Sequence, residues 1–272
     1  MEESARCRAE LESARVQEWT IPYWRGASSG TYFADHITLY TRPVKAANSA
    51  VQAFVDDAAE PAVQGFLHRP ATPSGDGLVL THGAGGNANM ALLVALAETF
   101  ADAGFFVARC NLPFRQRRPH GPPSPASAAS DREGLRNAVA TLRRFATGRI
   151  FLGGQSYGGR QASILCADDP TLVAGLILLS YPLHPPGKPD QLRIAHLPKL
   201  QVPTLFVEGT SDPFATIPEI QLAMKLIPAK HELLEVEGAG HDLGFKAKSQ
   251  KTDLPTKVFS TFQSLFFGNS PT

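Results

Sequence analysis

The sequence has few cysteines and no strong excess of charge of either sign. Its three cysteines, Cys7, Cys110 and Cys166, are odd in number and lie far apart. This spacing argues against a disulfide framework and against a metal-binding cysteine cluster, and it indicates reduced thiols in a cytoplasmic protein. The net charge is +1, so neither nucleic acid nor an anionic membrane surface is an expected partner.

Long apolar runs are also absent. None approaches the roughly 20 residues that a membrane-spanning helix needs, and the charged stretch 1–6 lacks the apolar core of a signal peptide. We therefore expect a cytoplasmic protein without a membrane partner. The 272 residues, of which 43% are hydrophobic and 19% are charged, suffice for one large α/β domain with a buried core.

The two parts of the chain differ in pattern. Residues 2–18 are rich in alanine, glutamate and arginine, so a surface helix with a thin apolar face is predicted there. We expect this helix and an irregular extension over residues 1–30, followed by a single domain over residues 31–272. The start of that domain is predicted to contain a strand over 31–40 and a pair of strands over 51–55 and 62–68.

From residue 78 onwards, short apolar runs alternate with amphipathic segments. This alternation predicts an α/β fold whose mostly parallel sheet has helices on both faces, and in such sheets ligands bind beyond the carboxyl ends of the strands. The predicted strands are 78–81, 105–109, 150–152, 176–180, 203–208 and 231–236. The predicted helices are 89–103, 131–146 with Asp131 as its cap, one after residue 156, 218–227 and 256–267.

One pentapeptide carries the first indication of chemistry. Residues 154–158 (GQSYG) match the pattern G-x-S-x-G between a buried apolar run, 150–152, and the start of a helix. A serine on such a tight turn lies in strained backbone with its hydroxyl exposed, and the helix N-terminus favours negative charge beside it. Ser156 is therefore the predicted nucleophile. A chain with 23 glycines also contains plain Gly-rich turns, so the prediction depends on suitable partners.

Two later loops supply such partners. Asp212 follows the strand predicted over 203–208, and His241 follows the last predicted strand, 231–236. Both loops therefore lie at the same edge of a parallel sheet as Ser156. The order Ser, Asp, His along the chain is one of the orders found in serine hydrolases.

In this arrangement each residue has a defined role. Ser156 attacks a carbonyl carbon, His241 accepts its proton as general base, and Asp212 orients and stabilises the imidazolium. Glu208 is the alternative acid because it also ends a strand. Asp242 is a weaker alternative because it adjoins His241 in the chain.

Small residues follow the first strand of the predicted parallel sheet, at 82–86 (HGAGG). Backbone N–H groups can approach a substrate closely there, and each fixed donor to a developing oxyanion is typically worth about 3 kcal/mol. We expect the N–H groups of Ala84 and Tyr157 to form an oxyanion hole, with Gly85 as the alternative to Ala84. The side chain of His82 is expected to be structural.

Two Pro-rich loops, 111–130 and 181–202, are predicted to form the walls of the site, and neither is long enough for a separate lid domain. Arg115, Arg117 and Arg118 fit recognition of an acidic or phosphorylated substrate, but we favour a solvated basic loop. Tyr181 and His184 fit either a pocket wall or the packing of its rim. The candidate pocket residues are Phe114, Arg115, Tyr181, His184 and Phe214.

At these residues the sequence resembles the α/β-hydrolase superfamily and, within it, the dienelactone-hydrolase-like group. It is most similar to the hydrolase-like domain shared by the testis-expressed hydrolase-like protein and the third subunit of the NSL acetyltransferase complex, which has many bacterial members. The resemblance covers about residues 60–267 and rests on the stretches 82–86, 109–115, 153–160, 180–187, 209–214 and 238–242.

The resemblance implies an α/β-hydrolase fold with a triad of Ser156, Asp212 and His241, and it implies no metal and no organic cofactor. A dienelactone hydrolase proper uses a cysteine nucleophile, so the serine here argues against that specific activity. We expect a serine hydrolase that cleaves small to medium carboxylic esters, or thioesters, through an acyl-enzyme. Peptide hydrolysis and acyl transfer use the same triad. A scaffold or binding protein is the alternative, because the related domain of the NSL complex serves assembly.

Overall fold

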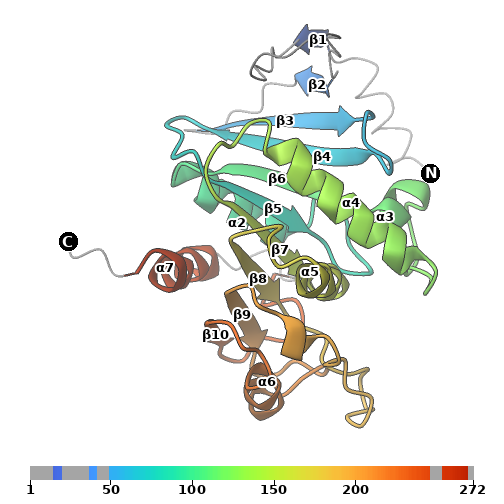
Figure 1. Cartoon of the computed structure of the whole chain (residues 1–272), viewed down its shortest axis with the longest axis vertical. Coiled ribbons are helices and arrows are strands. Elements are labelled where there is room, and N and C mark those ends of the chain that lie inside the picture. Colours follow the sequence, from blue (N-terminus) through green and yellow to red (C-terminus); the bar gives the residue numbers. More distant parts are fainter. Residues whose placement is uncertain (1–14, 20–36, 42–48, 246–252, 269–272) are drawn as a thin grey trace.

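The computed structural model describes residues 15–19, 37–41, 49–245 and 253–268. Within these ranges, ten strands form one sheet in the order β1-β2-β3-β4-β6-β5-β7-β8-β9-β10 (Figure 1). The elements in chain order are β1 (Arg15–Trp19), β2 (Ile37–Thr41), β3 (Ser49–Asp56), β4 (Val63–Pro70), β5 (Gly77–Thr81), α2 (Ala91–Asp102), β6 (Phe106–Asn111), α3 (Pro113–Arg117), α4 (Ser127–Leu142), β7 (Ile150–Gln155), α5 (Tyr157–Asp168), β8 (Gly175–Leu179), the 3-10 helix η1 (Leu197–Lys199), β9 (Thr204–Gly209), α6 (Ile217–Met224), β10 (His231–Val236) and α7 (Leu254–Phe267).

The sheet has an antiparallel part and a parallel part. Strands β1 to β4 pair antiparallel with one another, and β4 pairs antiparallel with β6. From β6 through β5, β7, β8 and β9 to β10 every pairing is parallel. All residues of β5, β7, β8 and β9 are buried, as expected for strands covered on both faces. The carboxyl ends of these strands meet at one edge, where the site lies.

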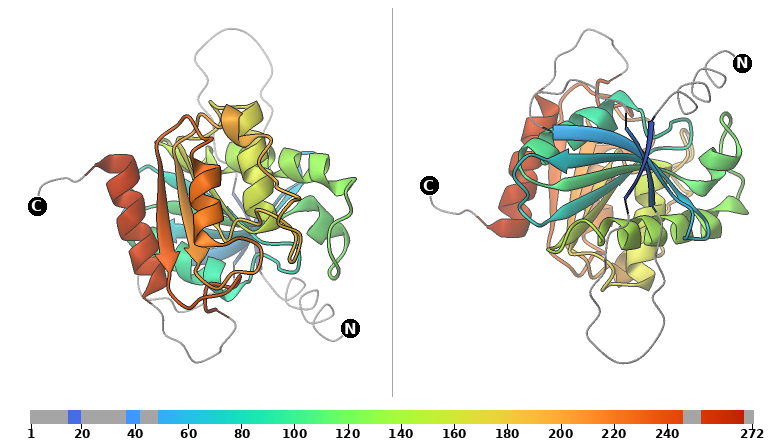
Figure 2. Two further views of the ribbon diagram at one scale, coloured as in Figure 1. Left: turned by 90° about the horizontal axis from the view of Figure 1, so that it is seen from below. Right: turned by 90° about the horizontal axis from the view of Figure 1, so that it is seen from above.

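Helices cover both faces of the sheet, as predicted. Helices α2 and α7 pack on one face, where the rings of Phe100 and Phe262 meet edge to face at 4.9 Å. Helices α4, α5 and α6 pack on the opposite face through buried side chains such as Leu135, Leu165 and Ile220. Figure 2 shows α7 and α5 on opposite sides of the strands. No separate lid domain is present in the part of the chain that the structure describes.

The N-terminal prediction needs a correction. Residues 15–18, expected at the end of a helix, belong to strand β1, which pairs antiparallel with β2. A helix here would bury little apolar surface, whereas pairing with β2 gives the backbone hydrogen-bond partners. The rest of that predicted helix, residues 2–14, lies outside the described residues, as do residues 31–36 of the strand predicted over 31–40. The domain boundary at residue 30 stays a prediction.

The segment predicted as a long loop, 111–130, is the second correction. It contains helix α3 and the first turn of α4, which begins at Ser127. Proline is compatible with a helix at its first position, where its missing N–H is not needed, and Pro113 occupies that position in α3. Asp131 therefore lies inside α4 and does not cap it. The remaining predicted elements are found with their ends shifted by a few residues.

Asp131 connects three helices instead. Its carboxylate is buried and accepts hydrogen bonds from the backbone N–H of Phe114 in α3, at 2.9 Å, and from the hydroxyl of Tyr157 in α5, at 2.7 Å. Burial raises the pKa of this carboxyl group. The contacts hold α3 beside the N-terminus of α5.

Among the helices described here, none combines the length and the apolar character that crossing a membrane requires.

Candidate active site

Ser156 occupies the sharp turn between β7 and α5. Its φ of 51° and ψ of −118° are unfavourable for a residue with a Cβ and persist only where the surroundings fix them. Glycines provide that close packing. A Cβ on Gly154 would lie 2.6 Å from the backbone nitrogen of Gly159, and a Cβ on Gly158 would lie 2.4 Å from the carbonyl oxygen of His82. The turn therefore fits tightly between its own strand and the loop after β5.

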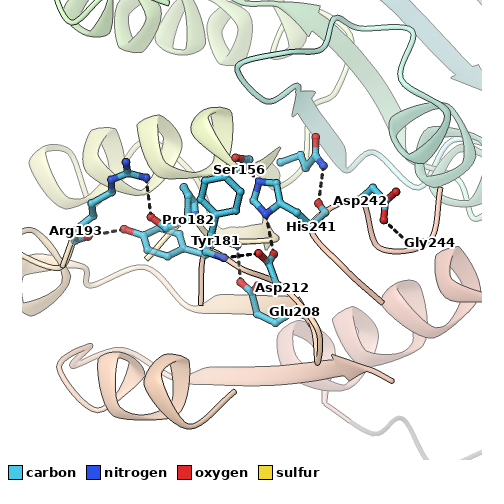
Figure 3. A network of polar contacts seen from close by, with 11 residues as sticks. Ser156, Tyr181, Pro182, Arg193, Glu208, Asp212, His241, Asp242 and Gly244 are labelled. Carbon is cyan, nitrogen blue, oxygen red and sulfur yellow. Dashed lines mark hydrogen bonds and ion pairs between the residues drawn. The ribbon is translucent and has the colours of Figure 1, made fainter. Parts of the chain in front are cut away.

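Two hydrogen bonds connect Ser156 to Asp212 through His241 (Figure 3). The serine Oγ lies 2.8 Å from Nε2 of the imidazole, and Nδ1 lies 2.7 Å from Oδ2 of the aspartate. Because a carboxylate only accepts, Nδ1 carries the proton and Nε2 is free to accept one from the serine hydroxyl. The Asp212 side chain is 0% exposed, so its charge acts on the imidazole with little screening by water.

Neighbouring groups fix the two partners of the serine. The backbone N–H of Phe214 donates to Oδ1 of Asp212 at 2.8 Å, and the side-chain amide of Gln155 donates to the carbonyl oxygen of His241 at 3.1 Å. The Phe214 ring stacks on the imidazole with 4.1 Å between ring centroids. The structure thus places Phe214 at the site. The sequence analysis missed Gln155, although it directly precedes the serine in the G-x-S-x-G pattern.

The loop after β5 lies directly beside the serine. A Cβ on Gly83 would be 3.3 Å from the Cβ of Ser156. The backbone N–H groups of Ala84, Gly85 and Tyr157 form no hydrogen bond within the described part of the chain. The site therefore has backbone donors next to its hydroxyl that are available to a developing oxyanion. Which of the first two amides faces that oxygen stays a prediction.

Comparison with known proteins now decides the family. Residues 75–261, more than half of the chain, match the alpha/beta hydrolase domain family. The chain belongs to this family. Its fold also matches solved structures of dienelactone hydrolase from Anabaena variabilis ATCC 29413 (20% identity, TM-score 0.63, 81% of this chain and 98% of the other covered), of XC6422 from Xanthomonas campestris, described as an α/β serine hydrolase without lid (16%, 0.59, 85% and 99%), and of Est1E from Butyrivibrio proteoclasticus (16%, 0.59, 80% and 98%).

His82 has a structural role in this alpha/beta hydrolase domain. Its side chain is buried, Nδ1 lies 2.8 Å from the carbonyl oxygen of Gly83, and Nε2 accepts a hydrogen bond of 3.1 Å from the backbone N–H of Leu112. Burial lowers the pKa of His82 to about 4, so the ring is neutral at pH 7. It connects the candidate oxyanion loop to the end of β6.

The contacts of Arg115 differ from the prediction that this residue lines the substrate pocket. Its side chain is 6% exposed and donates to four backbone carbonyl groups, which leaves little of the guanidinium for a ligand. The acceptors are the carbonyl oxygens of Gly86 at 2.8 Å, Ala84 at 2.7 Å, Gly121 at 3.1 Å and Arg118 at 3.2 Å. Two of them belong to the candidate oxyanion loop, so Arg115 positions that loop.

Removing this guanidinium is expected to affect turnover more than substrate binding. Arg115→Met should lower kcat for a neutral ester by about 10- to 100-fold, because a displaced oxyanion donor loses stabilisation of up to about 3 kcal/mol. The measurement is steady-state hydrolysis of 4-nitrophenyl butyrate together with the thermal midpoint.

Arg143→Met is the matched control, since Arg143 donates to the carbonyl oxygen of Leu172 at 2.7 Å on the surface. The positioning role would be contradicted if the control lost as much kcat, or if Arg115→Met changed KM and left kcat unchanged.

Tyr181 and His184 pack the rim of the site instead of lining a pocket. Both side chains are buried. The hydroxyl of Tyr181 donates to the carbonyl oxygen of Arg193 at 2.8 Å, and Nδ1 of His184 lies 2.8 Å from the carbonyl oxygen of Pro185. These contacts within the segment 181–202 give it a fixed shape and decide between the two roles considered for these residues.

The two alternative acids are not in contact with the imidazole. Glu208 is fully buried, and its Oε1 accepts a hydrogen bond of 2.5 Å from the backbone N–H of Tyr181, as Figure 3 shows. Its Oε2 has no partner among the described residues. Burial, and to a lesser degree the charge of Asp212, raises the pKa of Glu208 well above its usual range. Asp242 accepts from a backbone amide two residues further on. Asp212 is therefore the acid that orients His241.

The raised pKa of Glu208 predicts that the stability difference between the wild type and a Glu208→Gln variant depends on pH. Because the folded pKa lies above the unfolded value, the unfolded state releases this proton first, and folding stability falls as pH rises above about 4.5. Glu208→Gln keeps the acceptor for Tyr181 without a titrating group. The free energy of unfolding of this variant, relative to that of the wild type, should increase by up to about 1.4 kcal/mol for each pH unit above about 4.5.

Urea unfolding at pH 5 and pH 8 measures the difference. The control Glu208→Ala also lacks the titrating group but leaves a buried N–H without an acceptor, so it should be about 1 to 3 kcal/mol less stable than Glu208→Gln at both pH values. A difference between the Gln variant and the wild type that stays constant from pH 5 to pH 8 would show that the buried carboxyl is already ionised in the folded protein at pH 5 and would contradict the prediction.

Proposed function

We propose that the protein is a serine hydrolase that cleaves small to medium carboxylic esters, with thioesters as related substrates, through an acyl-enzyme on Ser156. The observation that carries this proposal is the pair of hydrogen bonds from Ser156 through His241 to buried Asp212, formed on a strained turn beside backbone amides without partners. A serine hydroxyl becomes an effective nucleophile when an oriented base accepts its proton.

The proposed reaction has two steps. In the first, Nε2 of His241 accepts the hydroxyl proton while Oγ of Ser156 bonds to the ester carbonyl carbon, and the negative oxygen faces the N–H groups of Ala84 and Tyr157. The imidazolium then protonates the leaving alkoxide as the ester bond breaks. In the second step, His241 takes a proton from water, the hydroxide attacks the acyl carbon, and the serine recovers its proton. Asp212 stabilises the imidazolium throughout.

Two further findings support a compact substrate that reaches the serine without the movement of a lid. The described structure has no separate lid domain over the site, which suits compact substrates that enter directly from solvent. Neighbours of the same fold include XC6422, which is described as a serine hydrolase without lid. The nucleophile position here holds serine, so the specific activity of a dienelactone hydrolase is not part of the proposal.

Pre-steady-state kinetics test this function. Mixing enzyme with 4-nitrophenyl butyrate should release a burst of nitrophenol close to the enzyme concentration, and intact-protein mass spectrometry after a rapid acid quench should find one butyryl group, mapped to Ser156. The butyryl thioester of a chromogenic thiol, run in parallel, ranks the two acyl classes. A folded protein that gives neither a burst nor an adduct would contradict the proposal and favour the scaffold alternative, which the narrower resemblance to the NSL-complex domain suggests.

The cysteines agree with this assignment of the nucleophile. Cys110 and Cys166 are free and buried, and burial raises the pKa of each thiol to about 12. Thiols of this kind are poor nucleophiles at pH 7, so neither competes with Ser156. We propose the cytoplasm as the location, because free thiols persist in reducing compartments.

A further inference from the structure

A cavity of about 320 Å³ lies between α3 and the start of α4. This volume is at the lower end of the range that binds small ligands. Figure 2 shows the two helices of this region together beside α5. The cavity is lined by a mixture of one aromatic ring, two arginines, two hydroxyl groups and small apolar groups, among them Phe114, Arg117, Arg118, Pro123, Ser124 and Ser127.

We propose that this cavity binds an anionic group of the substrate, a carboxylate or a phosphate, so that the preferred esters carry a negative charge. The inference rests on the function proposed above and adds a substrate class to it. Arginine is well suited to such groups, because its planar donors bind carboxylate and phosphate oxygens in pairs.

The charge of the cavity is positive and is not neutralised by its own lining. No lining residue carries a carboxylate. Nη2 of Arg118 donates to the carbonyl oxygen of Pro122 at 2.9 Å, and Nη1 of Arg117 lies 3.4 Å from the hydroxyl of Ser130. Neither guanidinium forms an ion pair within the described residues. Most of their N–H groups thus remain available for an anion.

One acid that interacts with Arg117 is already used by the protein. Asp131 lies close enough to Arg117 for the two charges to interact. Its carboxylate is buried and accepts from the backbone N–H of Phe114 and from the hydroxyl of Tyr157. It therefore supports the wall of the cavity from behind and does not neutralise the open side.

Hydroxyl groups add donors to the cavity, and a helix terminus adds partial positive charge. The hydroxyl oxygens of Ser124 and Ser127 lie 3.0 Å apart, and a hydroxyl can turn to donate to an anion. Ser127 is also the first residue of α4, a helix of 16 residues whose N-terminus has no side-chain cap. The partial positive charge at such an end has the same sign as the arginines and reinforces them.

One aromatic pair separates the cavity from the nucleophile. The ring of Phe114 lines the cavity and meets the ring of Tyr157 edge to face, with 5.7 Å between centroids. Tyr157 directly follows Ser156, and the ends of β6 and β7 lie at the same edge of the sheet with only β5 between them. The proposed anion site is thus one aromatic pair away from the nucleophile, and the proposal requires an ester whose charged group extends past this pair.

Matched ester pairs test the inference. 4-Nitrophenyl hydrogen glutarate and 4-nitrophenyl pentanoate differ in a charge on the acyl side, and 4-acetoxybenzoate and 4-acetoxytoluene differ in a charge on the alcohol side. We expect the charged member of one pair to have the higher kcat/KM. In the double variant Arg117→Gln/Arg118→Gln, the kcat/KM of the charged ester divided by that of its neutral partner should fall by about 10- to 100-fold, because charge-assisted hydrogen bonds are lost.

A control variant and a binding measurement make the outcome decisive. Lys225→Gln/Lys257→Gln removes the same charge from two exposed positions, the C-terminal cap of α6 and a residue within α7, and should leave both kcat/KM ratios unchanged. Titration of the unreactive Ser156→Ala protein with 4-nitrophenyl hydrogen glutarate should give a Kd that rises about tenfold or more on adding the two arginine changes. The anion site would be overturned if the ratio of kcat/KM for charged and neutral esters were equal in all variants, or if the Kd for the glutarate ester did not change with the two arginine substitutions. A protein that turns over none of the four esters but loses binding with the arginines would contradict the hydrolase proposal and leave the anion site standing.

Discussion

Replacing Ser156 with alanine is expected to lower kcat for ester hydrolysis by at least about ten thousand-fold while the protein stays folded. The hydroxyl is the group that bonds to the acyl carbon, and the residual rate then comes only from the backbone donors and from substrate binding. Steady-state hydrolysis of 4-nitrophenyl butyrate with a circular dichroism spectrum measures both parts of the expectation. Alanine also relieves none of the strain at φ 51°, so stability should change little.

Non-additivity sharpens this prediction. His241→Ala should cost nearly as much as Ser156→Ala, and the double variant should cost no more than either, because the two side chains act as one unit. Additive losses would show that the residues act separately and would contradict the two-step mechanism.

A second serine–histidine pair in the same region provides the control. Oγ of Ser163 lies 2.8 Å from Nε2 of His196 and donates to the carbonyl oxygen of Arg160 at 2.9 Å. The hydroxyl proton is thus held by the helix backbone, and no aspartate of the described residues forms a hydrogen bond with this imidazole. Burial lowers the pKa of His196 to about 4. Ser163→Ala should therefore retain full turnover, which would separate the two serines.

Gly158→Val is expected to prevent stable folding, with a loss of about 4 kcal/mol or more. A Cβ at this position would lie 2.4 Å from the carbonyl oxygen of His82 and 2.7 Å from the Cγ2 atom of Thr81. The first of these is a backbone atom, so relief requires the loop after β5 to move away from α5. Overpacking against backbone cannot be relieved by changing a side-chain rotamer.

Soluble yield and urea unfolding measure this effect. Gly240→Ala is the control, because within 4 Å of its added Cβ the described residues place only the carbonyl oxygen of Ser211, at 3.9 Å, which is an ordinary contact. The control should unfold within about 1 kcal/mol of the wild type. Equal stability of the two variants would mean that the turn around Ser156 tolerates movement that the tight packing forbids.

The sequence was sufficient for the fold and for the approach of the three polar side chains. Ser156, Asp212 and His241 each follow a short apolar run, and the carboxyl ends of parallel strands meet at one edge, so their proximity follows from topology alone. The chain order allows both Asp212 and Glu208, since both lie between Ser156 and His241, and the structure decides between them. Glu208 ends its strand with the side chain buried beneath Tyr181, whereas the next turn brings Asp212 to the imidazole.

The loops could not be predicted to the same depth. The proline content of 111–130 indicated an irregular segment, although proline at the first position favours α3. Two of the four carbonyl partners of Arg115, those of Ala84 and Gly86, and the two donors to Asp131 come from loops and helices far apart in the chain. Such contacts depend on how separate segments pack, and no local pattern specifies them.

Reaction with a fluorophosphonate probe tests the central claim most directly, since it reports an activated serine without knowledge of the substrate. We predict that one probe molecule bonds to Ser156, that peptide mapping finds no label on Ser163, and that His241→Ala abolishes labelling in a folded protein. A folded wild type that stays unlabelled, or that carries its label on another residue, would contradict the assignment of Ser156, His241 and Asp212 as a working triad.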